Sequence, residues 1–163
     1  MKYIINERQY RLLTEEEQEV LQISSLNVFG GWEALQKFLE RKGNPLYSFE
    51  GYLNLRGTNI ESLGSLTSVG GSLDLRGTNI ESLGSLTSVG GSLFLNGCEN
   101  LTSLGNLTSV GGNLNLTGCK KLTSLGNLTS VGGILDLKRT PISRKYSREE
   151  IRQMIKVDGD IYL

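Results

Sequence analysis

Few residue types in this chain could take part in catalysis or bind a metal. The 163-residue sequence has no histidine, which removes the commonest general base and the commonest metal ligand. Its two cysteines, Cys98 and Cys119, cannot complete a zinc site without histidine. The sequence also lacks a phosphate-binding loop, a dinucleotide-binding fingerprint and a nucleophile elbow. We therefore expect no enzyme activity and no cofactor or metal.

The other candidate residues belong to a repeated segment, so the repeat decides where they lie. The stretch GYLNLRGTNIESLGSLTSVG (51–70) returns as GSLDLRGTNIESLGSLTSVG (71–90), and then twice more with one residue added, at 91–111 and 112–132. Such self-similarity predicts a solenoid in which each coil stacks on the previous one. A single coil buries too few side chains to offset the entropy of ordering about twenty residues, so we expect only the stack to fold.

Each repeat contains Leu-x-Leu followed three residues later by threonine or cysteine. This alternation is typical of a short strand with two inward leucines and one outward residue between them. The pattern resembles the leucine-rich-repeat signature L-x-L-x-x-[N/C]-x-L over about residues 46–163. The resemblance implies an α+β repeat fold, a leucine-rich-repeat solenoid with a parallel β-sheet of about six short strands. The motifs are Leu53, Leu55 and Thr58; Leu73, Leu75 and Thr78; Leu93, Leu95 and Cys98; Leu114, Leu116 and Cys119; and Leu135, Leu137 and Thr140.

Glycine pairs precede the strands at 70–71, 90–91, 111–112 and 132–133. Glycine at such places is typical of backbone that needs a positive φ, or of coils that approach too closely for a Cβ. We interpret the pairs as requirements of the backbone rather than as phosphate-binding loops.

The N-terminal segment before the repeats has a helical pattern. Thr14 with Glu17 forms a capping box that predicts a helix over about 15–22. The apolar spacing from Trp32 to Leu39 predicts a second helix that ends before the turn at 43–45, whereas residues 2–13 fit either a strand or a short helix. We expect a helical cap over 1–45 that seals the first coil.

The C-terminal segment combines a helix with a last strand. Ser147 with Glu150 predicts a helix through about Lys156, with Ile151, Met154 and Ile155 facing inward. The spacing of the last residues then repeats that of the earlier strands at 161–163. The expected organisation is a single compact domain, with leucine-rich repeats over 46–142 and the C-terminal helix and final strand over 143–163.

The residues that point outward from the strands form a stripe along one face, here called the strand face. Six strands about 4.8 Å apart give a face roughly 25 Å long, which suits a peptide or a protein surface. The near-identical repeats differ most along this stripe, and exposed aromatics beside arginine are typical of interaction hot spots. Free drift of solvated strand residues is the alternative explanation. The predicted contact residues are Tyr52, Asn54, Arg56, Asp74, Arg76, Phe94, Asn115, Asp136, Lys138 and Tyr162.

The spacing of polar residues in the stack disfavours other uses of it. The strand carboxylates Asp74 and Asp136 are three strands or roughly 14 Å apart, farther than paired glycosidase carboxylates, so a carbohydrate-cleaving solenoid is disfavoured. Cys98 and Cys119 stack at a spacing that permits a disulfide, but buried free thiols are the preferred interpretation. A single threonine per coil is a weak match to an ice-binding array, and we expect turn hydrogen bonds from this ladder instead. The ladder consists of Thr67, Thr87, Thr108 and Thr129.

Charge and hydropathy exclude two classes of partner. Lysine plus arginine and aspartate plus glutamate number 17 each, so no net field attracts nucleic acid or an anionic membrane. The basic cluster at 120–121 and 138–139 is too small for a nucleic-acid footprint on its own. No run of about 18 apolar residues occurs, and the N-terminus MKYIINERQYRLL lacks the pattern of a signal peptide. We expect a cytoplasmic protein.

These features favour a non-enzymatic protein-protein interaction module that binds a protein or peptide through the strand face. The Asn/Ser/Thr-rich coils and the start KYIINERQYRLL also resemble small repeat proteins of bacteria and large tailed phages. That resemblance implies, as a special case, a viral protein that engages a host factor in the host cytoplasm. The alternative is a structural module, a monomer or weak homo-oligomer that pairs end to end through the open strand at 161–163.

Overall fold

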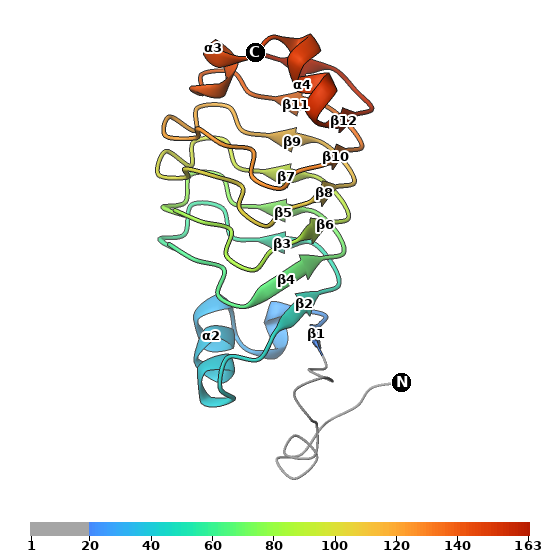
Figure 1. Cartoon of the computed structure of the whole chain (residues 1–163). Helices are drawn as coiled ribbons and strands as arrows, with labels where there is room; N and C mark the ends of the chain where they lie inside the picture. Colours follow the sequence, from blue (N-terminus) through green and yellow to red (C-terminus); the bar gives the residue numbers. More distant parts are fainter. Residues whose placement is uncertain (1–19) are drawn as a thin grey trace.

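The computed structural model describes residues 20–163, which form a solenoid of short parallel strands with helices near both ends (Figure 1). Each repeat contributes one strand to each of two parallel sheets. The predicted repeat solenoid is therefore confirmed. The helix predicted from Thr14 and the strand or helix at 2–13 lie wholly or largely outside the described residues.

The six-stranded sheet holds the Leu-x-Leu segments, as the sequence predicts. Its register sets each leucine beside the equivalent leucine of the next coil, so Leu53 pairs with Leu73 and Leu73 with Leu93. The strands are β3 (Leu53–Asn54), β5 (Leu73–Asp74), β7 (Leu93–Phe94), β9 (Leu114–Asn115), β11 (Leu135–Asp136) and β13 (Ile161–Tyr162).

A second, seven-stranded sheet was not predicted from the sequence. In its repeats Leu66 and Val69 are both buried three residues apart, a spacing without the two-residue alternation that identifies a strand. The two sheets meet at the glycine pairs, because only residues 70–72 separate β4 from β5. The strands are β1 (Leu21–Ile23), β2 (Tyr47–Phe49), β4 (Leu66–Val69), β6 (Ser88–Val89), β8 (Ser109–Val110), β10 (Ser130–Val131) and β12 (Lys156–Val157).

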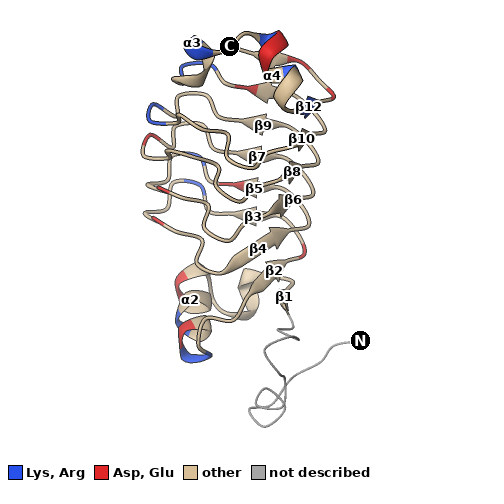
Figure 2. Cartoon of the chain, viewed as in Figure 1, with Lys and Arg blue, Asp and Glu red and all other residues tan. Residues whose placement is uncertain are grey.

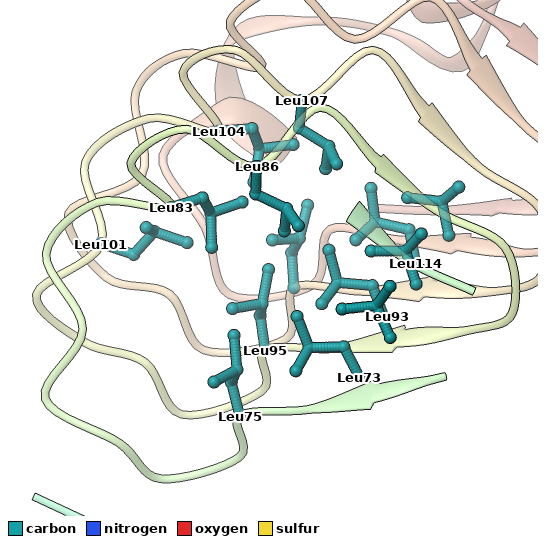
Figure 3. Packing of buried hydrophobic residues seen from close by; sticks show 14 of the residues in the cluster. Leu73, Leu75, Leu83, Leu86, Leu93, Leu95, Leu101, Leu104, Leu107 and Leu114 are labelled. Atoms are coloured by element: carbon teal, nitrogen blue, oxygen red, sulfur yellow. The ribbon is translucent and has the colours of Figure 1, made fainter. Parts of the chain in front are cut away.

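Leucines from the strands and from the returning loops fill the interior of the coils. Leu73, Leu93 and Leu114 stack in one column of the six-stranded sheet and meet leucines from the loops (Figure 3). Each of these side chains is fully buried. Because a coil covers the leucines of its neighbours, the apolar area of one repeat is buried chiefly by the repeats on either side.

The glycine pairs lie where the coils are closest. A Cβ at Gly111 would overlap the carbonyl oxygen of Gly90, and one at Gly71 would lie 2.7 Å from the carbonyl carbon of Gly51. The same overlap recurs at the other pairs, whose φ values are outside the left-handed region. Of the two reasons expected for these glycines, close contact between coils is therefore the correct one.

The N-terminal cap is only partly helical. Residues 21–23 form β1, whose amide at Leu21 donates to the carbonyl of Leu46 at 2.9 Å, so the helix predicted through residue 22 is wrong over the described residues. Pairing with β2 buries Ile23 and overrides the local helical signal. A short 3-10 helix, η1 (Leu26–Val28), then leads to the predicted helix α2 (Trp32–Arg41), which buries Leu35 and Leu39.

The C-terminal coil carries two helices, α3 (Ile142–Lys145) and α4 (Arg148–Met154). The predicted capping box of Ser147 and Glu150 starts α4. The helix stops before Lys156 because that residue pairs with β10, and Met154, predicted to face inward, is 50% exposed. Ile151 and Ile155 are buried as expected.

Arg152 covers the end of the seven-stranded sheet. In successive coils the carbonyls of Val69 and Gly71 accept the amides of the following coil. In the last coil the equivalent carbonyls, of Val157 and Gly159, each accept a hydrogen bond of 2.8 Å from the guanidinium of Arg152. One side chain thus takes the place of two backbone donors of a further coil.

Replacing Gly111 with alanine tests the close contact between coils. We expect Gly111→Ala to lower the free energy of unfolding by about 3 kcal/mol, because the new Cβ pushes two coils apart. Urea unfolding followed by circular dichroism measures the change. Gly51→Ala is the matched control, since its Cβ meets nothing within 4 Å, and we expect a change below about 0.5 kcal/mol. Equal effects of the two substitutions would contradict the interpretation.

Candidate binding surface

The outward residues predicted from the sequence lie in one row on the six-stranded sheet. Each is the register partner of the next, because the strands are parallel and in register. The row runs from Asn54 through Asp74, Phe94, Asn115 and Asp136 to Tyr162.

Four residues of this row also close the turn that follows their strand. Oδ1 of Asn54 accepts a hydrogen bond of 3.1 Å from the amide of Arg56, two residues on. Such an Asx turn satisfies a backbone donor at the end of the strand. The need for a short side-chain oxygen therefore explains why aspartate or asparagine stands at these places. The same bond is made by Asp74 to Arg76 (3.1 Å), by Asn115 to Thr117 (3.0 Å) and by Asp136 to Lys138 (3.0 Å).

Phe94 departs from this rule in the middle of the row. Its ring offers no acceptor to the amide of Asn96, and Oδ1 of Asn96 is itself buried without a hydrogen-bond partner. The third coil thus lacks the side-chain hydrogen bond that closes the turn in the other coils, and has a half-buried aromatic ring on the surface instead. Since the backbone does not explain this residue, Phe94 is the strongest candidate for direct contact with a partner.

Asp74 lies beneath its neighbours rather than on the surface. Only 1% of the residue is exposed, although its strand position faces outward. Its carboxylate forms an ion pair with the guanidinium of Arg76 and accepts hydrogen bonds of 2.9 and 3.1 Å from Nε of that residue. The hydroxyl of Tyr52 lies 3.4 Å from Oδ2. Asp74 was expected as a contact residue, but in this position it can act only by holding Arg76 and Tyr52.

Hydrogen bonds from Arg76 hold the pKa of the Asp74 carboxyl below its ordinary value, against the effect of burial, which raises it. The carboxylate therefore stays charged and keeps Arg76 in place.

The guanidinium of Arg76 in turn lies 5.3 Å from the centre of the Phe94 ring, within the range of a cation–π contact. Tyr52, Asp74, Arg76 and Phe94 form a connected group across β3, β5 and β7, which we call the aromatic–arginine cluster.

A smaller group of the same kind lies at the other end of the row. Nζ of Lys138 is 4.4 Å from the centre of the Tyr162 ring and 3.9 Å from the carboxylate of Asp136. Asn115 lies between this pair and the aromatic–arginine cluster. Arg56 is exposed beside Arg76, whose carbonyl accepts the amide of Gly57. The structure therefore gathers most of the predicted residues into two groups rather than one even stripe, and leaves Asn54, Arg56 and Asn115 outside both.

The seven-stranded sheet carries a shallow groove that the sequence did not point to. Its volume is about 430 Å³, and its floor is a repeated ladder of serines and glycines. Lys156 and Asp158 lie at one end. The ladders are Ser68, Ser88, Ser109 and Ser130, with Gly70, Gly90, Gly111 and Gly132. The close contact between coils requires glycine here, and the missing side chains account for part of the hollow.

The threonine ladder, at the start of the strands of the same sheet, links neighbouring coils. Oγ1 of Thr87 donates to the carbonyl of Thr67 at 2.9 Å, and Thr108 donates to Thr87 in the same way. The bonds therefore join one coil to the previous one, whereas hydrogen bonds within a turn were expected. Each hydroxyl proton is directed at the backbone rather than at surface water.

The two cysteines are buried free thiols, as predicted. Sγ of Cys98 donates to the carbonyl of Leu75 at 3.0 Å, and Sγ of Cys119 to that of Leu95 at 3.2 Å. Burial raises the pKa of both thiols, that of Cys119 to about 12, with the nearby Cys98 as a lesser cause. They stay protonated at neutral pH and act as small apolar residues with one hydrogen bond each.

Two further findings concern residues 20–163. No group of three or more His, Cys, Asp or Glu side chains in this part of the chain is placed to hold a metal ion. None of the helices found there combines the length and the apolar composition needed to span a bilayer.

Comparison of the chain with protein-family models, with curated proteins and with solved structures finds no match.

Replacing Asp74 tests whether it anchors Arg76. We expect Asp74→Asn to lower the free energy of unfolding by about 1–3 kcal/mol at neutral pH, because the carboxylate is buried and bonded. Since the folded protein lowers the pKa of this group, its stabilisation is complete above about pH 4 and is lost as the pH falls through the lowered value. Urea unfolding of both proteins at pH 7 and about pH 3 should show the difference shrinking in acid.

Arg76→Met provides the control for this experiment. It removes the guanidinium hydrogen bonds, the largest cause of the lowered Asp74 pKa, and keeps the backbone amide of residue 76 and the Tyr52 hydroxyl, so the acid-dependent effect of Asp74→Asn should be smaller in this background. An equally large acid-dependent effect of Asp74→Asn in the Arg76→Met background would show that Arg76 does not cause the effect.

Proposed function

We propose that this chain is a non-enzymatic interaction module of the leucine-rich-repeat kind, which binds a protein or peptide through the strand face. The observation that carries the proposal is Phe94, an aromatic residue placed where the turn favours an oxygen-bearing side chain. Arg76, fixed by Asp74, lies against its ring. A preorganised arginine beside a half-exposed aromatic ring loses little side-chain entropy on binding and offers apolar area with directional donors.

The spacing of the two groups indicates the size of the partner segment. Phe94 on β7 and Asp136 on β11 are two strands apart, or roughly 10 Å. An extended peptide rises about 3.3 Å per residue, so the two residues that contact the two groups would be about three positions apart in its sequence. Such a segment would cross the strands and run along the solenoid.

The proposed repeat family and the proposed origin of the chain rest on resemblance to known proteins. The leucine pattern supports membership of the leucine-rich repeats, and the Asn/Ser/Thr-rich coils support a bacterial or phage origin. In that case the partner would be a host protein, met in the cytoplasm of the host. The strand face would then be the surface that distinguishes this protein from others with the same repeat.

Affinity capture from a lysate of the native host, quantified by mass spectrometry, tests the strand face. We expect Phe94→Ala to reduce recovery of the specific partner about tenfold, since loss of a central aromatic costs more than 1 kcal/mol at most hot spots. Ser88→Ala, on the seven-stranded sheet, should leave recovery unchanged. Recovery that is the same with wild type and Phe94→Ala would exclude the strand face as the binding surface.

End-to-end self-association is the alternative function, because β13 is the C-terminal edge strand of the six-stranded sheet. The guanidinium of Arg152 already occupies the carbonyls of Val157 and Gly159 in the other sheet, so at the C-terminal end of the solenoid β13 alone is open to pairing. This restriction favours the binding module over the self-associating one.

Light scattering over a concentration series tests the alternative. We expect the mass of a single chain at every concentration, because β13 alone offers two residues of pairing surface. A mass that rises with concentration, and returns to that of one chain in Tyr162→Lys, would support self-association instead.

A further inference from the structure

Charges are separated along the turns that form one edge of the solenoid. On the outermost turns, Figure 2 shows acidic residues in the coils nearer α2, and lysine and arginine in the coil nearer α3 and on α3 itself, while Arg56 and Arg76 follow the strands of the acidic coils. The acidic residues are Glu61, Glu81 and Glu99. The basic residues, which we call the basic corner, are Lys120, Lys121, Arg139, Arg144 and Lys145, and all of them are exposed.

Most cations of the basic corner lack an acidic partner within the described chain. Lys120 pairs with Glu99 of the preceding coil at 2.6 Å. Lys121 donates to the amide oxygen of Asn100 at 2.9 Å, which leaves its charge uncompensated. Arg139, Arg144 and Lys145 form no ion pair with any carboxylate in residues 20–163. Nζ of Lys145 lies 4.9 Å from the centre of the Tyr146 ring, and all three exposed charges are without a carboxylate in this part of the chain and available to an anionic partner.

Arg139 is in a backbone conformation that favours glycine. Its φ is 59°, in the left-handed region that residues with a Cβ rarely adopt. In the preceding coils the same place is taken by Gly57, Gly77, Gly97 and Gly118, with φ values from 65° to 78°. The last coil thus has an arginine where the fold favours glycine, and packing does not explain it because the residue is exposed. A disfavoured conformation that persists at a charged surface residue points to a role in binding.

We propose that the basic corner binds an acidic segment of a polypeptide. The cations come from two successive turns and from α3, so they offer several separate contacts to carboxylates a few residues apart. The corner also adjoins the strand face, since Arg139 directly follows Lys138. The proposal does not depend on the strand face, which could bind the same partner or none.

A nucleic acid fits this surface less well than an acidic peptide. Five cations are few for a polyphosphate chain, and one of them is already paired with Glu99. Glu149 and Glu150 of α4 are exposed in the coil that carries α3, and they would repel a continuous line of phosphates. A peptide can carry its carboxylates at intervals, so that none of them lies beside Glu149 or Glu150.

Fluorescence anisotropy with a labelled peptide of about ten residues, in which glutamate alternates with serine, tests the proposal. We expect the variant Arg139→Gly/Arg144→Gln/Lys145→Gln to bind this peptide about tenfold more weakly than wild type at low salt. Arg139→Gly alone should weaken binding while leaving the protein as stable as wild type or more stable, because glycine is the residue that the other coils use.

The matched control is Lys37→Gln/Arg41→Gln/Lys42→Gln, which removes the same charge from exposed positions at the end of the solenoid that carries α2. Its affinity for the peptide should equal that of wild type. The proposal is overturned if wild type does not bind the peptide, if the control weakens binding as much as the corner variant, or if a single-stranded oligonucleotide of similar length binds more tightly than the peptide.

Discussion

Backbone contact between neighbouring coils at the glycine pairs sets the geometry of the whole solenoid. At Gly90, Gly111 and Gly132 the backbone of one coil lies against the carbonyl of the previous one, with no room for a Cβ. This contact joins the two sheets at a fixed corner, so hydrogen bonds in both follow the same spacing. It also stacks the leucines of each coil on those of its neighbours, which is how short repeats with little apolar surface bury a common core.

The short turns between strands limit which residue types can stand on the surface of the six-stranded sheet. An outward residue on the six-stranded sheet must usually supply the oxygen that closes its turn, as Asn54 and Asn115 do. Differences between aspartate and asparagine in this row therefore reflect the backbone as much as any partner. Phe94 and Arg139 break local requirements instead, one by omitting a turn bond and one by adopting a conformation that favours glycine. Departures from the repeat are thus more informative about binding than exposure alone.

Much of this architecture could be predicted from the sequence because the repeat gives the same local signal several times. The Leu-x-Leu strands, the buried cysteines and the capping box at Ser147 all follow from residue type and spacing. The seven-stranded sheet could not be predicted, since its inward residues are three apart and its pairing depends on the neighbouring coil. The burial of Asp74 and the bonds of Arg152 are equally non-local, because both depend on where side chains from other turns come to lie.

Near-identity of the repeats has a consequence for how such a gene can change. The segments 51–70 and 71–90 differ at two positions, Tyr52 against Ser72 and Asn54 against Asp74. Unequal recombination between them would add or delete one whole coil and would leave the leucine and glycine contacts between coils unchanged at the new junction. Length could therefore evolve in steps of one repeat, while the caps at either end stay the same. Selection could in this way match the reach of the solenoid to a partner before any individual surface residue had been changed.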